Sequence, residues 1–120
     1  MEPSAEPHSY GKIDTSGLKS LVASGVSLTL VDARTPQYDD GKRIPGALTL
    51  PAGSSESEVA SVLPDKDALI VAYCSNLKCP ASAMLADQLV SLGYKNVVKY
   101  PEGLAGWIDA GQSVTEKTDG

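Results

Sequence analysis

The sequence predicts an α/β domain in which a parallel sheet is covered by helices on both faces. Short apolar runs typical of strands alternate along the chain with segments whose apolar residues recur at helical spacing. The run at residues 69–73 is apolar throughout, which is typical of a strand buried on both faces. A chain of 120 residues is long enough for one domain with a hydrophobic core, and no internal repeat or linker is evident.

The first half of the chain is expected to form three strands and two helices. The first helix begins at a capping residue, Asp14 or Thr15, and ends at Gly25. The second helix covers residues 54–63. The strands are expected at residues 10–13, 28–31 and 48–50.

The second half contains the strand at 69–73, a polar loop and a helix that begins at Pro80 and ends at Gly93. A strand at 96–100 and a short helix at 104–110 follow. We expect the domain to span residues 10–111. The polar segments 1–9 and 112–120 are predicted to be flexible tails.

Cys74 is the first candidate for chemistry, because it directly follows the buried strand and precedes the loop that opens a helix. The N-terminus of a helix carries unpaired N–H groups and a partial positive charge. A thiol facing that end ionises more readily, and the thiolate is the reactive form. A cysteine after an apolar strand is more often a small buried hydrophobe. The polar residues that follow Cys74 favour the reactive interpretation.

The composition excludes several other classes of site. His8 is the single histidine and lies in the polar N-terminal segment, so a Ser-His-Asp or Cys-His arrangement has no candidate base. Two cysteines and one remote histidine fall short of a zinc site. We therefore expect no metal and no organic cofactor.

Charge and hydropathy limit the partners. The net charge is -5 and there is no basic run, so nucleic acid and anionic membranes are not expected partners. No apolar stretch approaches the ~20 residues that span a bilayer. We expect a cytoplasmic monomer, while removal of a targeting segment would also allow an organellar or periplasmic location.

Asp32 and Arg34 stand two residues apart at the end of the strand at 28–31, so their side chains point the same way. We interpret them as a supporting polar pair that holds loops at the sheet edge. Lys78 is interpreted as a solvated residue that could also attract an anion. Trp107 is expected in the core, and Gly103 at a turn.

Three stretches of the chain resemble motifs of the rhodanese-like domain. Residues 30–34 (LVDAR) and 43–47 (RIPGA), followed by Pro51, resemble its opening motifs. Residues 71–74 (VAYC) resemble the strand that leads to its active cysteine, and 102–107 (EGLAGW) with 110–111 (AG) its closing motif. The resemblance implies the rhodanese fold, a parallel five-stranded sheet flanked by helices. It also implies that Cys74 accepts sulfane sulfur as a persulfide and passes it to a thiophilic acceptor.

The length of the loop agrees with sulfur transfer. Sulfur-transferring members of the family have six loop residues counted from the cysteine, whereas the related phosphatases and arsenate reductases have seven. Here the loop runs from Cys74 to Cys79, six residues. Its other members are expected to surround the Cys74 sulfur with their backbone amides; they are Ser75, Asn76, Leu77, Lys78 and Cys79.

Two positions depart from the family pattern. Cys79 replaces the usual arginine at the end of the loop, which removes a bidentate cation suited to thiosulfate. Arg43 stands where the family has histidine, and we interpret this as a neutral exchange at the surface.

Cys79 itself has three interpretations that spacing does not rank: a residue at the start of a helix, a disulfide partner, or a second redox thiol. A thiolate at Cys79 could attack a persulfide on Cys74, release sulfide and leave a disulfide. We expect that disulfide only under oxidation, with the resting protein reduced.

The sequence thus favours a sulfurtransferase whose partners are a small sulfur donor or protein persulfide and a thiol acceptor. Two alternatives stay open. One is a thiol–disulfide redox protein that uses Cys74 and Cys79. The other is a non-catalytic rhodanese-like module that binds a partner.

Overall fold

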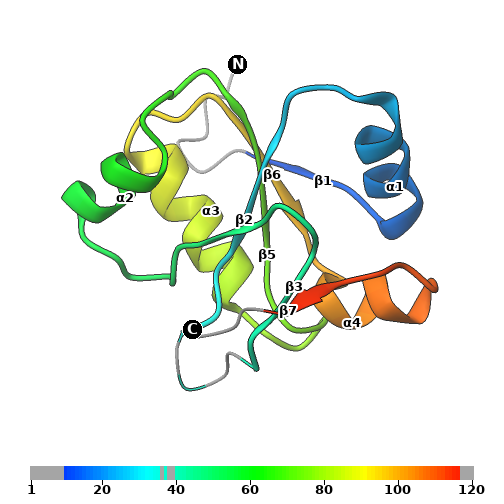
Figure 1. Ribbon diagram of the computed structural model, residues 1–120. Coiled ribbons are helices and arrows are strands. Elements are labelled where there is room, and N and C mark those ends of the chain that lie inside the picture. The colour runs from blue at the N-terminus through cyan, green and yellow to red at the C-terminus, as the bar shows by residue number, and fades with distance from the viewer. Residues whose placement is uncertain (1–9, 36, 38–39, 117–120) are drawn as a thin grey trace, which may run out of the picture.

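The computed structural model describes residues 10–35, 37 and 40–116, which form a layered α/β structure (Figure 1). Its centre is a five-stranded sheet with the order β1-β6-β5-β2-β4, and every pairing is parallel. The predicted fold class is confirmed. The strands are β1 (Gly11–Lys12), β2 (Thr29–Asp32), β4 (Leu48–Thr49), β5 (Leu69–Tyr73) and β6 (Asn96–Tyr100).

Helices cover both faces of the sheet (Figure 1). One face carries α2 (Glu56–Val62) and α3 (Ala81–Ser91), and the other carries α1 (Thr15–Ser24) and α4 (Gly103–Asp109). Among the described residues, none of the helices is long and apolar enough to cross a bilayer.

The central strand β5 supplies residues to a hydrophobic core on each face. Ile70 and Ala72 pack in the core beneath α2 and α3, whereas Val71 and Tyr73 pack in the core beneath α1 and α4. All four are fully buried. This alternation follows from the pleat of a strand, and it explains why the run is apolar at every position.

The first two helices begin at side-chain caps, and the first ends at a glycine in the left-handed region. Asp14 accepts a hydrogen bond from Gly17 N at 2.7 Å, and Gly25 ends α1 with a φ of 78°. Ser55 and Glu58 form a reciprocal capping box at the start of α2. These local signals explain why the predicted helix boundaries agree closely with the structure.

The C-terminal segment differs from the prediction of a flexible tail after residue 111. Strand β7 (Thr115–Glu116) pairs antiparallel with β3 (Lys42–Arg43), and Trp107 Nε1 donates to Ser113 O at 2.9 Å. Val114 packs against the core that contains Trp107. Two such short strands of polar residues produce no periodic pattern of apolar positions. The sequence therefore did not predict their pairing. Residues 1–9 and 117–120 of the predicted tails lie outside the described residues.

Candidate active site

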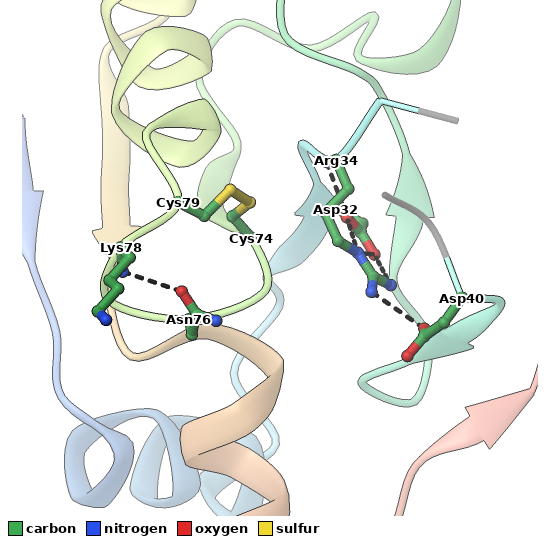
Figure 2. Close-up of a disulfide and its surroundings, with 7 residues drawn as sticks. All are labelled: Asp32, Arg34, Asp40, Cys74, Asn76, Lys78 and Cys79. Atoms are coloured by element: carbon green, nitrogen blue, oxygen red, sulfur yellow. Dashed lines mark hydrogen bonds and ion pairs between the residues drawn. A yellow bond between two sulfur atoms is a disulfide. The ribbon is translucent and has the colours of Figure 1, made fainter. Parts of the chain in front are cut away.

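The predicted site residues come together at the carboxyl ends of β5 and β2, which are neighbours in the sheet. Asp32 lies opposite Tyr73 in the register, so Cys74 and Arg34 leave adjacent strands at the same edge. Figure 2 shows the two groups facing each other across this edge. Ligands of open parallel sheets bind at such edges.

The loop after Cys74 is held by its own turn and by helix α4. Asn76 Oδ1 accepts from Lys78 N at 2.9 Å, and Asn76 O accepts from Cys79 N at 3.2 Å. On the other side, Leu104 N and Ala105 N donate to Cys74 O and Ser75 O at 2.9 and 2.8 Å. The loop therefore has a defined backbone path from β5 to α3.

Cys74 and Cys79 are joined by a disulfide, with their Cα atoms 6.2 Å apart. This separation lies within the range of about 4.4–6.8 Å that disulfides need. The expectation of a reduced resting loop is not met in this structure, because the turn at Asn76 brings the two ends of the loop together. Of the three interpretations of Cys79, the structure selects the disulfide partner.

The two cysteines are unequally exposed. Cys74 is 1% exposed, whereas Cys79 is partly exposed. Figure 2 shows the disulfide joining the two ends of the loop, with the Lys78 side chain directed away from the sulfur atoms. Lys78 is exposed and its backbone N–H is bonded to Asn76, so the structure gives its side chain no direct role at the disulfide.

Asp32 and Arg34 form a buried ion pair, as interpreted from the sequence. Arg34 Nη2 lies 2.7 Å from Asp32 Oδ2, and both side chains are nearly inaccessible. Arg34 also donates to Asp40 Oδ1 at 3.0 Å and to Lys42 O at 2.6 Å. The pair therefore ties the end of β2 to the following loop. Burial alone would lower the pKa of Arg34, but its bonds and charge attraction to Asp32 and Asp40 raise it.

The interpretation of Arg43 as a surface exchange is wrong. Arg43 is 5% exposed, and its Nη1 lies 3.4 Å from Asp32 Oδ2. Its Nε and Nη2 donate to Thr49 Oγ1 at 3.1 and 2.8 Å. Asp32 thus stands between two arginines. A carboxylate at the end of an apolar strand needs buried cationic partners, and that requirement was the signal available in the sequence.

Sequence reasoning also missed Tyr73 as a supporting residue. Its ring is fully buried and its hydroxyl accepts from Ile44 N at 3.2 Å. Burial, reinforced by the charge of Asp32, raises the pKa of Tyr73. Through this hydrogen bond, the Tyr73 side chain holds in place the segment that contains Arg43 and Ile44.

A family model for the rhodanese-like domain matches residues 14–110. The chain belongs to the rhodanese-like domain family. The match lies within the predicted domain of residues 10–111, and it agrees with the sequence resemblance. No curated protein sequence is significantly similar to the chain.

Solved structures share the fold of this rhodanese-like domain. The BH2092 protein of Bacillus halodurans matches with a TM-score of 0.78 and 21% identity, over 88% of this chain and 77% of that one. The Alr3790 protein of Anabaena sp. matches with a TM-score of 0.74 and 26% identity, over 89% and 82%. The thiosulfate sulfurtransferase of Pseudomonas aeruginosa matches with a TM-score of 0.73 and 21% identity, over 91% of this chain and 21% of that protein.

The rhodanese-like loop presents unused backbone donors. Within the described part of the chain, the N–H groups of Ser75, Asn76 and Leu77 donate to no acceptor. The side chains of Asn76 and Leu77 are exposed. Such amides can stabilise a negative charge that develops on a sulfur within the loop. No group of three metal-binding side chains occurs among the described residues.

A small cavity of about 180 Å³ opens beside the disulfide. It is lined by Cys79 but not by Cys74. Met84 follows the apolar spacing of α3, yet it is 56% exposed, and it also lines this cavity. Two larger hollows, of about 640 and 420 Å³, lie on the outer side of the loop around Leu77 and touch neither cysteine.

Proposed function

We propose that the reduced chain is a sulfurtransferase that carries sulfane sulfur as a persulfide on Cys74. The observation that carries the proposal is the position of Cys74, at the carboxyl end of β5 and at the start of a six-residue loop with unused amides. Membership of the rhodanese-like family supports the reaction class. The likeness to a thiosulfate sulfurtransferase points the same way.

The transfer proceeds by two attacks on sulfur. The Cys74 thiolate attacks the outer sulfur of a persulfide or polysulfide donor, and the remainder of the donor leaves with the electron pair as a thiolate or shorter polysulfide. An acceptor thiolate then attacks the outer sulfur of the Cys74 persulfide. The acceptor leaves as a persulfide and the Cys74 thiolate is restored, so no net oxidation occurs.

The disulfide must be reduced before this reaction can begin. While Cys74 is bonded to Cys79, its sulfur is not a nucleophile and is almost inaccessible. A dithiol reductant would release both thiols, and the amides of the loop then favour the thiolate of Cys74. The redox state of the loop thus determines whether it accepts sulfane sulfur.

A thiol–disulfide redox protein is the second candidate, and the disulfide is the observation that favours it. In this function the loop would exchange electrons with a partner thiol pair, and no sulfur atom would be transferred. The two functions differ in whether the protein gains mass from a sulfane donor.

The test is sulfur uptake measured by intact mass. The reduced protein, Cys74→Ser and Cys79→Ser are each exposed to polysulfide and to glutathione persulfide. We expect one added sulfur in the native protein and in Cys79→Ser, and none in Cys74→Ser. Transfer to an added thiol should then return the native mass. Reversible disulfide exchange without any added sulfur would refute the transferase and leave the redox function.

A further inference from the structure

We propose that the disulfide form of the loop takes up the hydrosulfide ion at Cys79, so that sulfide as well as sulfane sulfur can charge the domain. The inference rests on the proposed function, because it ends in the same persulfide on Cys74. It assigns Cys79 a catalytic role as the sulfur that is attacked.

The difference in solvent exposure favours attack of hydrosulfide at Cys79 rather than at Cys74. A thiolate can cleave a disulfide only at a sulfur that it can reach. Cys74 is 1% exposed, whereas Cys79 is partly exposed and lines the cavity of about 180 Å³ together with Pro80, Ala81 and Met84. That volume exceeds the ~30 Å³ that one water molecule occupies in the liquid. A hydrosulfide ion, with a single heavy atom, therefore fits.

The stability of the thiolate that leaves also favours attack at Cys79. Attack at Cys79 expels Cys74 as a thiolate, and the sulfur that better supports negative charge leaves faster. Cys74 adjoins the loop amides of Ser75, Asn76 and Leu77, which have no acceptor among the described residues. Arg34 also lines the cavity, but Asp32 and Asp40 balance its charge, so we assign it no part in holding the anion.

Two successive attacks on sulfur convert sulfide into the Cys74 persulfide. Hydrosulfide attacks Cys79 Sγ, the S–S bond breaks, and its electron pair goes to Cys74. The sulfide sulfur loses two electrons and the disulfide gains them, which gives a Cys79 persulfide and a Cys74 thiolate. The Cys74 thiolate then attacks the outer sulfur, leaving a Cys74 persulfide and a Cys79 thiolate that takes up a proton. After transfer to an acceptor, exchange with an external disulfide compound restores the loop and releases two thiols.

The chain itself provides a means of locating the added sulfur. Trypsin cleaves after Lys78, so Cys74 falls in peptide 67–78 and Cys79 in peptide 79–95. The oxidised protein is mixed with sodium sulfide, quenched at increasing times with excess N-ethylmaleimide and digested without reductant. We expect the first added sulfur on the Cys79 peptide, in roughly tenfold excess over the Cys74 peptide, followed by its appearance on Cys74.

Glutathione serves as a second probe, because its attachment marks the sulfur that was attacked. The same rapid quench should place glutathione on the Cys79 peptide and N-ethylmaleimide on Cys74. A first label on Cys74, equal labels at the earliest time, or no uptake from sulfide would overturn the inference.

The reduced native protein separates this inference from the proposed function. It lacks the disulfide, so it should gain no sulfur from sulfide while still gaining one from polysulfide. If polysulfide is taken up but the oxidised native protein takes up no sulfide, only the present inference is refuted. If the reduced native protein gains no sulfur from polysulfide, the proposed function is refuted.

Discussion

Gly103 lies directly against the backbone of Cys74. A Cβ atom at position 103 would stand 2.4 Å from Cys74 O and 2.9 Å from the carbonyl carbon of Ser75. Gly103 also has a φ of +65°, which side chains rarely tolerate. The start of α4 can therefore bind the base of the loop only because residue 103 has no side chain.

Replacing Gly103 by alanine should displace the loop. We expect Gly103→Ala to lower the free energy of unfolding by about 3 kcal/mol or more, because backbone atoms must shift to admit the methyl group. It should also slow persulfide formation on Cys74. Denaturant unfolding and the sulfur-uptake assay measure the two effects.

The matched control is Gly111→Ala, since Gly111 has a φ of +79° and nothing within 4 Å of the added Cβ. It should show only the backbone penalty of about 1–2 kcal/mol. If the two variants lose the same free energy of unfolding, the close approach of Gly103 to Cys74 does not contribute to stability.

We expect the stability of the protein to depend strongly on the charge of Asp32, which pairs with both Arg34 and Arg43. Asp32→Asn removes the charge between Arg34 and Arg43, both nearly inaccessible, and should cost about 3–5 kcal/mol of stability. The control is Asp40→Asn, whose side chain is 55% exposed and which should change stability by no more than about 1 kcal/mol. Thermal unfolding compares the two, and similar losses would contradict the assigned roles.

The sequence predicted the sheet and the position of Cys74 because both depend on local signals. The apolar run that ends at Tyr73 and the helix that follows Pro80 placed Cys74 at a strand end without any tertiary information. Arg43 could not be placed in this way. Its burial depends on Asp32, eleven residues earlier, and on the pairing of β3 with β7 near the end of the chain.

The Cys74–Cys79 disulfide was left open for a related reason. Spacing places two cysteines near each other but does not fix the direction of their side chains. That direction comes from the turn at Asn76 and from the bonds of α4 to the loop, which join residues far apart in sequence. Motif spacing thus placed the candidate nucleophile Cys74, whereas its disulfide partner was identified only from the structure.

Tyr73 should contribute to the loss of stability at alkaline pH. Its pKa is raised in the folded protein, so its stabilisation is complete below the unfolded value of about 10 and is lost as the pH rises toward the folded value. Tyr73→Phe should flatten this decline. It should also cost about 1–3 kcal/mol at neutral pH, because Ile44 N loses its acceptor. Urea unfolding from neutral pH upward tests both effects, and an unchanged alkaline slope would argue against them.

Cys74 should titrate below an ordinary thiol once the disulfide is removed. In Cys79→Ser the loop amides remain next to Cys74 and favour its thiolate. The alkylation rate, followed by intact mass across pH, reports the midpoint directly. A midpoint at or above ~8.5, the free-thiol value, would remove the physical basis for an activated Cys74.

The choice of sulfur donor should depend on position 79. Thiosulfate is an anion that a bidentate guanidinium would hold, and this loop has a cysteine where the family usually has arginine. We therefore expect the reduced native protein to use thiosulfate poorly and polysulfide well. Cys79→Arg should improve turnover of thiosulfate by about tenfold, the equivalent of one charge-assisted contact of about 1.4 kcal/mol.

Two further variants isolate the cause of that gain. Cys79→Ser removes the disulfide without adding a cation, so it should leave thiosulfate turnover low. Lys78→Arg adds the guanidinium at the adjacent position, whose side chain is directed away from the disulfide in Figure 2, and it should also fail to improve turnover. Steady-state rates with both donors distinguish these cases. If Lys78→Arg matched Cys79→Arg, general positive charge rather than a positioned guanidinium would explain thiosulfate use.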